Sequence, residues 1–280
     1  MINQLKTVLL LGLLTGVLLA VGGLVGGTQG LTIALGFSLL MNFGSYFWSH
    51  KIVLSMYKAK EVKKSDYPKL FAMVKKLSEK AEIPVPKIYV VPSNNPNAFA
   101  TGRNPSHGIV AYTKGILSLL SEKELEGVTG HELNHIKNRD ILVQTVAATI
   151  AGVISYVAMM ARWSAIFGGF GNRNGGGGNI VELLVLAIIT PIIAVLVQLA
   201  ISRSREYLAD ESAARLLKDG SGLASALTKL ESCSNKRPMR LGSEGTAHLF
   251  IVNPFKGNVF TKLLSTHPSV RERVRKLNNF

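Results

Sequence analysis

Four long apolar stretches limit the folds open to this chain more than any other feature. Each has roughly the 20 apolar residues needed to cross the hydrocarbon core of a bilayer, and none carries a charge near its centre. They cover residues 8–26, 31–48, 141–163 and 180–201. The mean hydropathy of +0.26 also argues against an ordinary soluble protein. The sequence therefore predicts a mainly α-helical integral membrane protein with four transmembrane helices.

The lengths of the connecting segments group these stretches into two hairpins. Only a few residues around Thr28 and Gln29 separate the first two stretches, which predicts a tight turn. Residues 168–179 are almost all Gly and Asn, which predicts a flexible linker on the outer side of the membrane. A cleaved signal peptide with Lys6 as its positive region is an alternative for the first stretch. The stretch lacks the clean small-x-small cleavage site that a signal peptide would have, which argues against this alternative.

The distribution of basic residues predicts the orientation in the membrane. The net charge is +15, and lysines concentrate in residues 51–64, while Arg203 and Arg205 follow the fourth stretch. The positive-inside rule then places both termini and both polar regions in the cytoplasm, although Arg162 and Arg173 lie on the opposite side. Such a charge also occurs in nucleic-acid binders. The sequence contains no recognised motif of that class, so we expect no specific nucleic-acid partner.

The apolar stretches divide the chain into four segments. We expect a transmembrane hairpin (1–49), a cytoplasmic segment (50–140), a second hairpin (141–202) and a second cytoplasmic segment (203–280). We expect the two cytoplasmic segments to form together one α+β domain at a cell inner membrane. The single cysteine, Cys233, cannot form an intramolecular disulfide, which fits a reducing compartment.

The first polar segment has the pattern of a helix followed by a small sheet. Apolar residues at helical spacing from Leu70 to Leu77 predict a helix, with Ser65 or Asp66 as its cap. Two short runs rich in Val, Ile and Tyr predict strands at residues 87–91 and 108–112. A third short strand is predicted at residues 97–100, after an Asn/Pro turn.

A second helix follows the sheet and carries the most informative motif. Ser121 and Glu124 match a capping box at its start. Gly130 is a poor helix former, and we expect it to let the sheet approach closely. The sequence HELNH occupies residues 131–135.

The HELNH motif has the pattern of a zinc-dependent hydrolase. His131 and His135 are four residues apart, so they project from one face of a helix and can bind one metal ion. Glu132 lies beside that ion, where it can take a proton from a bound water. The alternative is a pair of surface histidines on an amphipathic helix.

A catalytic zinc ion needs a third protein ligand and one open position. If the last two apolar stretches form a hairpin centred near residue 171, positions 135 and 206 lie about 36 and 35 residues from it. At about 1.5 Å per residue both then lie at the same height above the membrane, which favours Glu206. Other candidates are carboxylates and the histidines His50, His107, His248 and His267. Because only about 9 Å of helix rise separates His135 from Ile141, we expect both ligand helices to continue from membrane helices.

Asp210 supports the choice of Glu206. It lies one helical turn further along the same face, and such a carboxylate commonly accepts the free N–H of a ligand histidine. The alternative is a solvated acidic face beside Arg203 and Arg205.

Together these motifs resemble the HtpX family of membrane-bound zinc metalloproteases, relatives of the CAAX prenyl proteases. The resemblance covers essentially the whole chain and is carried by residues 97–102, 131–135, 202–210 and 266–268. It implies a zincin-like (gluzincin) domain with one Zn²⁺ per chain. It also implies endopeptidase activity on misfolded or unassembled membrane proteins. Residues 269–273 are more basic than the usual family pattern, which leaves their contacts open.

The resemblance also assigns roles in catalysis. Glu132 is the general base. His267, in a C-terminal His-Pro, is the candidate for stabilising the oxyanion, with Tyr207 and Arg205 as weaker candidates. The alternative for His267 is a surface position beside a helix.

For substrate binding, the strand at residues 108–112, with Ile109 and Ala111, is a candidate to take up the polypeptide as an added strand. Asn97 is a candidate to hold the substrate backbone, and its alternative role is turn formation before the neighbouring strand.

Two other functions share part of this pattern. One is a prenyl-protein endopeptidase, but such relatives have more membrane spans. The other is a membrane scaffold that keeps zinc for structure. The complete HExxH-plus-Glu set argues against it, because a structural site usually closes its fourth position with Cys or His.

Overall fold

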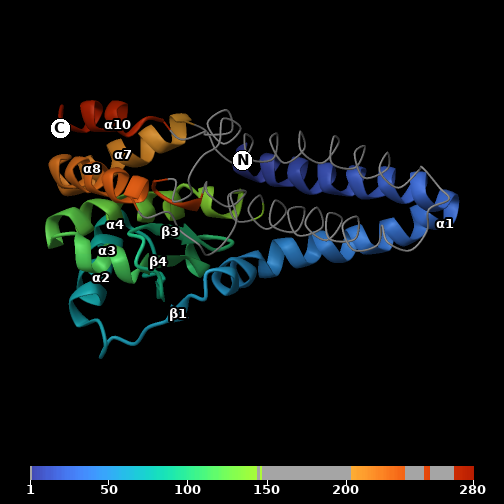
Figure 1. Ribbon diagram of the computed structural model, residues 1–280, viewed down its shortest axis with the longest axis horizontal. Coiled ribbons are helices and arrows are strands. Elements are labelled where there is room, and N and C mark those ends of the chain that lie inside the picture. The colour runs from blue at the N-terminus through green and yellow to red at the C-terminus, as the bar shows by residue number, and fades with distance from the viewer. Residues whose placement is uncertain (1, 144–145, 147–202, 237–248, 253–267) are drawn as a thin grey trace.

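A computed structural model describes residues 2–143, 146, 203–236, 249–252 and 268–280. It consists of a long N-terminal helical hairpin and a domain in which helices pack against a small sheet (Figure 1). The fourth predicted membrane stretch (180–201), the linker (168–179) and nearly all of the third stretch (141–163) lie outside the described residues.

The N-terminal hairpin is helix α1, Ile2–Met56. Its helical geometry breaks at Gly27, which has φ 56° and ψ −139°. A positive φ favours glycine, because glycine has no Cβ atom. The two arms run side by side (Figure 1), and Asn42 Nδ2 donates a hydrogen bond of 2.8 Å to Thr15 Oγ1 across them. The predicted turn near Thr28 is therefore confirmed, one residue earlier.

Length and hydropathy identify a single candidate for membrane crossing within the described residues. It is a pair of helical pieces, Gly27–Gly44 and Tyr46–Met56, that meet at a bend of 71°. No unbent helix in the described part of the chain meets the same criteria. The arrangement of four transmembrane helices therefore stays a prediction.

The sheet has four strands: β1 (Lys60–Glu61), β2 (Lys87–Val91), β3 (Ala98–Thr101) and β4 (Ile109–Thr113). Their order is β1-β2-β4-β3, with β2 and β4 parallel and the other pairs antiparallel. The three predicted strands are confirmed to within a residue. β1 has only two exposed polar residues, so it carries no pattern that could have predicted it.

The position of β4 corrects one prediction. β4 is an interior strand, paired with β2 on one side and β3 on the other, and all five of its residues are buried. Its main chain has no free edge for a further strand. The predicted role of Ile109 and Ala111 in binding substrate by strand addition is therefore wrong.

The helical elements of the domain are α2 (Pro68–Ala81), the short 3₁₀ helix η1 (Pro105–His107), α3 (Lys114–Leu119), α4 (Glu122–Lys137), α7 (Arg203–Leu217), α8 (Ser221–Lys236) and α10 (Val270–Leu277). α4 is central and contacts α2, α7, α8 and β3. Figure 1 shows α4 between the sheet and the C-terminal helices. α2 starts at Pro68 after Tyr67, without a side-chain cap. The predicted caps Ser65 and Asp66 are therefore wrong.

Apolar side chains fix α4 in the centre of this domain. Val128, Leu133 and Ile136 are completely buried in the same core as Leu227 of α8 and Ile88 of β2. Each such side chain contributes about 1.5–3 kcal/mol to folding. This packing holds the HELNH segment rigidly in the interior of the domain.

The C-terminal helices pack against two glycines of α4, and at Gly127 the contact leaves no room for a side chain. A Cβ atom on Gly127 would lie 2.6 Å from Leu223 N of α8, which only glycine permits. A Cβ on Gly130 would lie 3.4 Å from Ala213 Cβ of α7. The prediction that the sheet approaches Gly130 is wrong, because the neighbour is α7. This close approach brings α7, which carries Glu206, against the helix that carries the two histidines.

The start of α4 is fixed by the predicted capping box, which is confirmed. Ser121 Oγ accepts from Glu124 N, and Glu124 Oε2 accepts from Ser121 N at 2.9 Å. The same carboxylate accepts from Ser225 Oγ at 2.6 Å and from Lys229 Nζ at 2.9 Å, both on α8. Burial alone would raise the pKa of Glu124, but the hydrogen bonds from Lys229, Ser225 and Ser121 outweigh it and lower the pKa to about 2.

We expect Glu124→Gln to destabilise the domain at about pH 7 by about 1–2 kcal/mol, because it removes a charged cap and the ion pair to α8. The depressed pKa stabilises the fold above the unfolded pKa of about 4.5, and this stability is lost as the pH falls through about 2. The difference in free energy of unfolding between Glu124→Gln and the wild type should therefore shrink as the pH falls from about 4.5 to about 2. Denaturant unfolding across pH tests this, with the exposed Glu122→Gln as control. A deficit that is unchanged at about pH 2 would contradict the account.

Candidate metal centre

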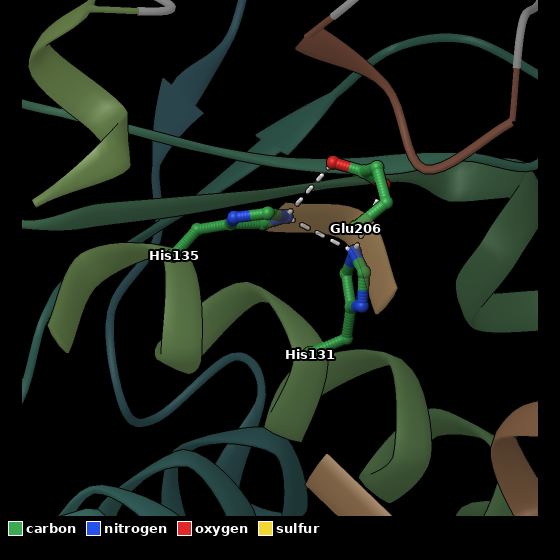
Figure 2. Close-up of side chains that lie close together, drawn as sticks. All are labelled: His131, His135 and Glu206. Carbon is green, nitrogen blue, oxygen red and sulfur yellow. Dashed lines mark hydrogen bonds and ion pairs between the residues drawn. The ribbon is translucent and has the colours of Figure 1, made fainter. Parts of the chain in front are cut away.

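Three buried side chains from two helices converge on one point (Figure 2). His131 Nε2 and His135 Nε2 of α4 are 3.1 Å apart. Glu206 of α7 places Oε2 3.6 Å from His131 Nε2 and Oε1 3.5 Å from His135 Nε2. The three donor atoms all lie within 4.8 Å of one another. The structure thus brings together the three residues that the sequence predicted as metal ligands.

The opposite nitrogen of each imidazole contacts a carboxylate. His131 Nδ1 lies 2.9 Å from Asp210 Oδ1, and His135 Nδ1 lies 3.2 Å from Asp140 Oδ2. A carboxylate at Nδ1 favours the tautomer with its proton there, so each Nε2 keeps its lone pair for the common point. Two imidazole lone pairs and a carboxylate are the donor set that a catalytic zinc ion takes.

Asp140 reaches His135 because the chain turns sharply after α4. The helix ends at Lys137, and Arg139 has a φ of 58° before helical geometry resumes at Asp140. The prediction that this helix runs unbroken into the third apolar stretch is therefore wrong. Sequence reasoning also missed Asp140, although an acidic residue just after a ligand helix and just before an apolar stretch is an unusual combination that could have indicated it.

Each of these carboxylates also contacts an arginine. Arg273 of α10 donates from Nε to Asp210 Oδ2 at 2.8 Å and from Nη2 to Asp210 Oδ1 at 2.7 Å. Arg205 Nη1 lies 3.6 Å from Asp140 Oδ1. Burial would raise the pKa of Asp210, but the charge and hydrogen bonds of Arg273 lower it, so the carboxylate stays ionised. Two chains of contacts, Arg–Asp–His, thus hold the two imidazoles from behind.

Glu132 lies in the same buried region, between the histidines in sequence. Its side chain accepts a hydrogen bond from the main chain of Ala100 in β3. Burial, aided by the charge of Glu206, raises the pKa of Glu132 to about 7, although His135 and Arg273 act in the opposite direction. A carboxyl group of this kind can exchange a proton near neutral pH.

The electrostatics of the site favour a divalent cation. Among the described residues, four buried carboxyl groups face only two guanidinium groups, so the acidic side chains outnumber the basic ones around the imidazoles. Burial lowers the pKa of His135, but its hydrogen bond to Asp140 and the charges of Glu206 and Glu132 outweigh burial and raise it to about 9. The surroundings of His135 therefore favour positive charge, which a metal ion would supply.

The other predicted site residues lie elsewhere or have other partners. Asn97 is completely buried, its Nδ2 donates to Val252 O at 2.6 Å and its Oδ1 accepts from Ala98 N at 3.1 Å. These contacts hold Asn97 between β3 and Val252, which is not the turn formation given as its alternative, and a contact with substrate stays a prediction. Tyr207 donates its hydroxyl to Glu272 Oε2 at 2.9 Å. His267 lies outside the described residues.

A buried helix with HExxH, a carboxylate ligand on a second helix and a supporting sheet define a metallohydrolase of the HExxH class. Comparison with known proteins agrees. Residues 64–280 match peptidase family M48. A protein named Protease HtpX homolog from Thermodesulfovibrio yellowstonii is 54% identical over 98% of this chain and 97% of its own length. Another protein of that name, from Thermococcus kodakarensis, is 50% identical over 99% of this chain and 96% of its own length.

The crystal structure of S. mikatae Ste24p shares the fold, with a TM-score of 0.52 at 17% sequence identity. The match covers 99% of this chain and 65% of the Ste24p chain. The chain belongs to peptidase family M48, and it is a membrane metalloprotease.

We expect Asp140→Asn to weaken metal binding about 10–100-fold, because the amide no longer fixes the tautomer and orientation of His135 as a carboxylate does. Competition against a chromophoric chelator measures this affinity. The control is Asp219→Asn, which changes a surface carboxylate that pairs with Lys123. Equal affinity in Asp140→Asn and the wild type would show that the contact with His135 does not support metal binding.

Proposed function

We propose that this chain is a zinc-dependent endopeptidase that hydrolyses polypeptides at the surface of a cell inner membrane. The observation that carries the proposal is the convergence of His131, His135 and Glu206, whose donor atoms lie within 4.8 Å of one another and are backed by carboxylates. These three residues would hold one Zn²⁺ per chain. A zinc ion in such a site lowers the pKa of a coordinated water to about 7 and polarises a carbonyl group.

Glu132 is proposed as the general base. It directly follows His131 on α4, is almost completely buried, and is anchored by the main chain of Ala100. From this position it would take the proton from the attacking water and deliver it to the departing amine nitrogen. His267 stays a proposal for stabilising the oxyanion, based on the family resemblance of its His-Pro motif.

β3 replaces β4 as the proposed site of substrate binding. β3 is the edge strand of the four-stranded sheet next to β4, and its Ala100 N–H contacts the proposed base. Residues 249–252 contact the start of this edge, where Ile251 N donates to Ala98 O. A polypeptide could therefore lie only along the far end of β3, at residues 100–101, where it would pass directly by Glu132. Recognition through the main chain suits extended, unfolded segments, which supports misfolded or unassembled membrane proteins as the substrate class.

The membrane arrangement is also part of the proposal. The arms of α1 carry large apolar side chains that are more than half exposed, among them Val8, Ile33, Leu40 and Phe43. Figure 1 shows these arms extending away from the domain that contains the metal centre. An isolated apolar surface of this kind requires lipid or protein to cover it. With the two apolar stretches that follow α4, this supports four spans, and the basic residues next to them support a cytoplasmic active site.

Glu132→Gln tests the mechanism. We expect the variant to bind one zinc ion per chain as the wild type does, because Glu132 is not a ligand. Its rate of peptide hydrolysis should fall by about 10²–10⁴-fold or more, because the proton acceptor is removed. The measurements are metal analysis and cleavage of an unfolded membrane protein by the purified chain in detergent.

Glu122→Gln serves as the matched control, because Glu122 is an exposed residue of the same helix. It should keep both zinc and activity. Near-complete turnover in Glu132→Gln would reject Glu132 as the base. A wild type that binds zinc but cleaves nothing would instead favour the zinc-binding scaffold.

A further inference from the structure

Arg273 is a charged residue on the buried face of a short helix. In α10 the buried residues are Val270, Arg273 and Leu277, and Arg273 is only 1% exposed. The neighbouring arginines on α10, Arg271 and Arg275, are exposed. A buried guanidinium strongly destabilises a protein unless its N–H groups are partnered. The hydrogen-bond partners of Arg273 therefore indicate the role of this buried side chain.

One side of the guanidinium fork holds the metal centre. Nε and Nη2 donate to the two oxygens of Asp210 at 2.8 and 2.7 Å, and Asp210 Oδ1 is the atom that contacts His131 Nδ1 at 2.9 Å. Nη1 also lies 3.7 Å from Glu206 Oε2. A bidentate pair fixes the plane of the carboxylate as well as its charge. Arg273 therefore determines how Asp210 faces His131.

The other side of the fork holds the segment of residues 249–252. Arg273 Nη1 donates to Ile251 O at 3.0 Å. Ile251 N in turn donates to Ala98 O of β3 at 3.3 Å, and Asn97 holds the next carbonyl, Val252 O. This segment therefore lies against the outer edge of the first residue of β3. One side chain thus links the histidine ligand on α4 to the strand next to Glu132.

We propose that Arg273 is a positioning residue for catalysis, which orients His131 through Asp210 and holds residues 249–252 in register with β3. This inference rests on the proposed metal centre. The role requires the planar guanidinium group, because Nε and Nη2 must donate to Asp210 while Nη1 donates to Ile251 O. A lysine at this position keeps the positive charge but offers a single ammonium group, which cannot form the bidentate pair and reach Ile251 O as well.

The test uses the full chain in detergent with Co²⁺ in place of zinc, since cobalt gives visible absorption bands that report ligand geometry. We expect Arg273→Lys to stay folded, to bind Co²⁺ about 10–100-fold more weakly, and to show a shifted or weakened spectrum. Arg275→Lys is the matched control on the same helix and should leave both unchanged. Asp210→Asn should weaken binding similarly, and the double variant should be no weaker than the single ones, because both changes break one contact.

Three results would overturn the proposal: wild-type Co²⁺ affinity and spectrum in folded Arg273→Lys, an equal loss in Arg275→Lys, or fully additive losses in the double variant. If Arg273→Lys does not fold, Arg273→Gln decides, because its single amide can donate to Asp210 or to Ile251 O but not to both. Wild-type affinity and spectrum in folded Arg273→Gln would then reject the proposal, and a 10–100-fold loss would support it. Failure of the wild type to bind Co²⁺ at all would instead reject the proposed metal centre.

Discussion

The burial of several charges around two imidazole rings is the constraint on which this structure depends. An isolated ionised group in a protein interior destabilises the fold by several kcal/mol. Here His131, His135, Glu206, Glu132 and the two supporting aspartates are all less than a tenth exposed. Two arginines offset part of their negative charge. The carboxyl groups still outnumber the guanidinium groups, which favours a cation beside the imidazoles, so the electrostatic stability of the domain and its proposed catalytic role have the same physical basis.

The packing of helices explains how residues so distant in the chain form one site. α4 is fixed between the sheet and the C-terminal helices; Gly127 lets α8 approach its backbone, and α7 packs beside Gly130. α7 then places Glu206 and Asp210, one turn apart, on either side of His131. α10 closes the site with Arg273, which also contacts the segment beside β3. Each C-terminal helix therefore contributes to the position of a side chain on α4.

Local patterns in the sequence were sufficient for much of this arrangement. The helical period places His131 and His135 on one face, the capping box marks the start of α4, and hydrophobic runs mark three of the four strands. The spacing argument did select Glu206, which lies in the cluster, although the break at Arg139 shows that the continuous helix it assumed is not present. The predictions that were wrong depended on tertiary context. Strand addition at β4 is excluded by the order of the strands, which makes β4 an interior strand. The helix after His135 is not continuous, because Arg139 has a left-handed conformation that turns Asp140 back towards His135. The partners of Arg273 could not be predicted, because an arginine among the charged residues of α10 resembles a solvated one until packing is known.

The most direct measurement of the central claim is zinc K-edge X-ray absorption spectroscopy on the purified full chain. The structure predicts a single zinc environment with two imidazole nitrogens at about 2.0–2.1 Å, the remaining ligands being oxygens and none sulfur. Replacing Glu206 by Gln should remove or severely reduce the bound zinc, because it changes one of the three proposed ligands. A wild-type spectrum with a sulfur ligand or with three or more imidazoles, or full zinc content with an unchanged spectrum in Glu206→Gln, would contradict the site described here.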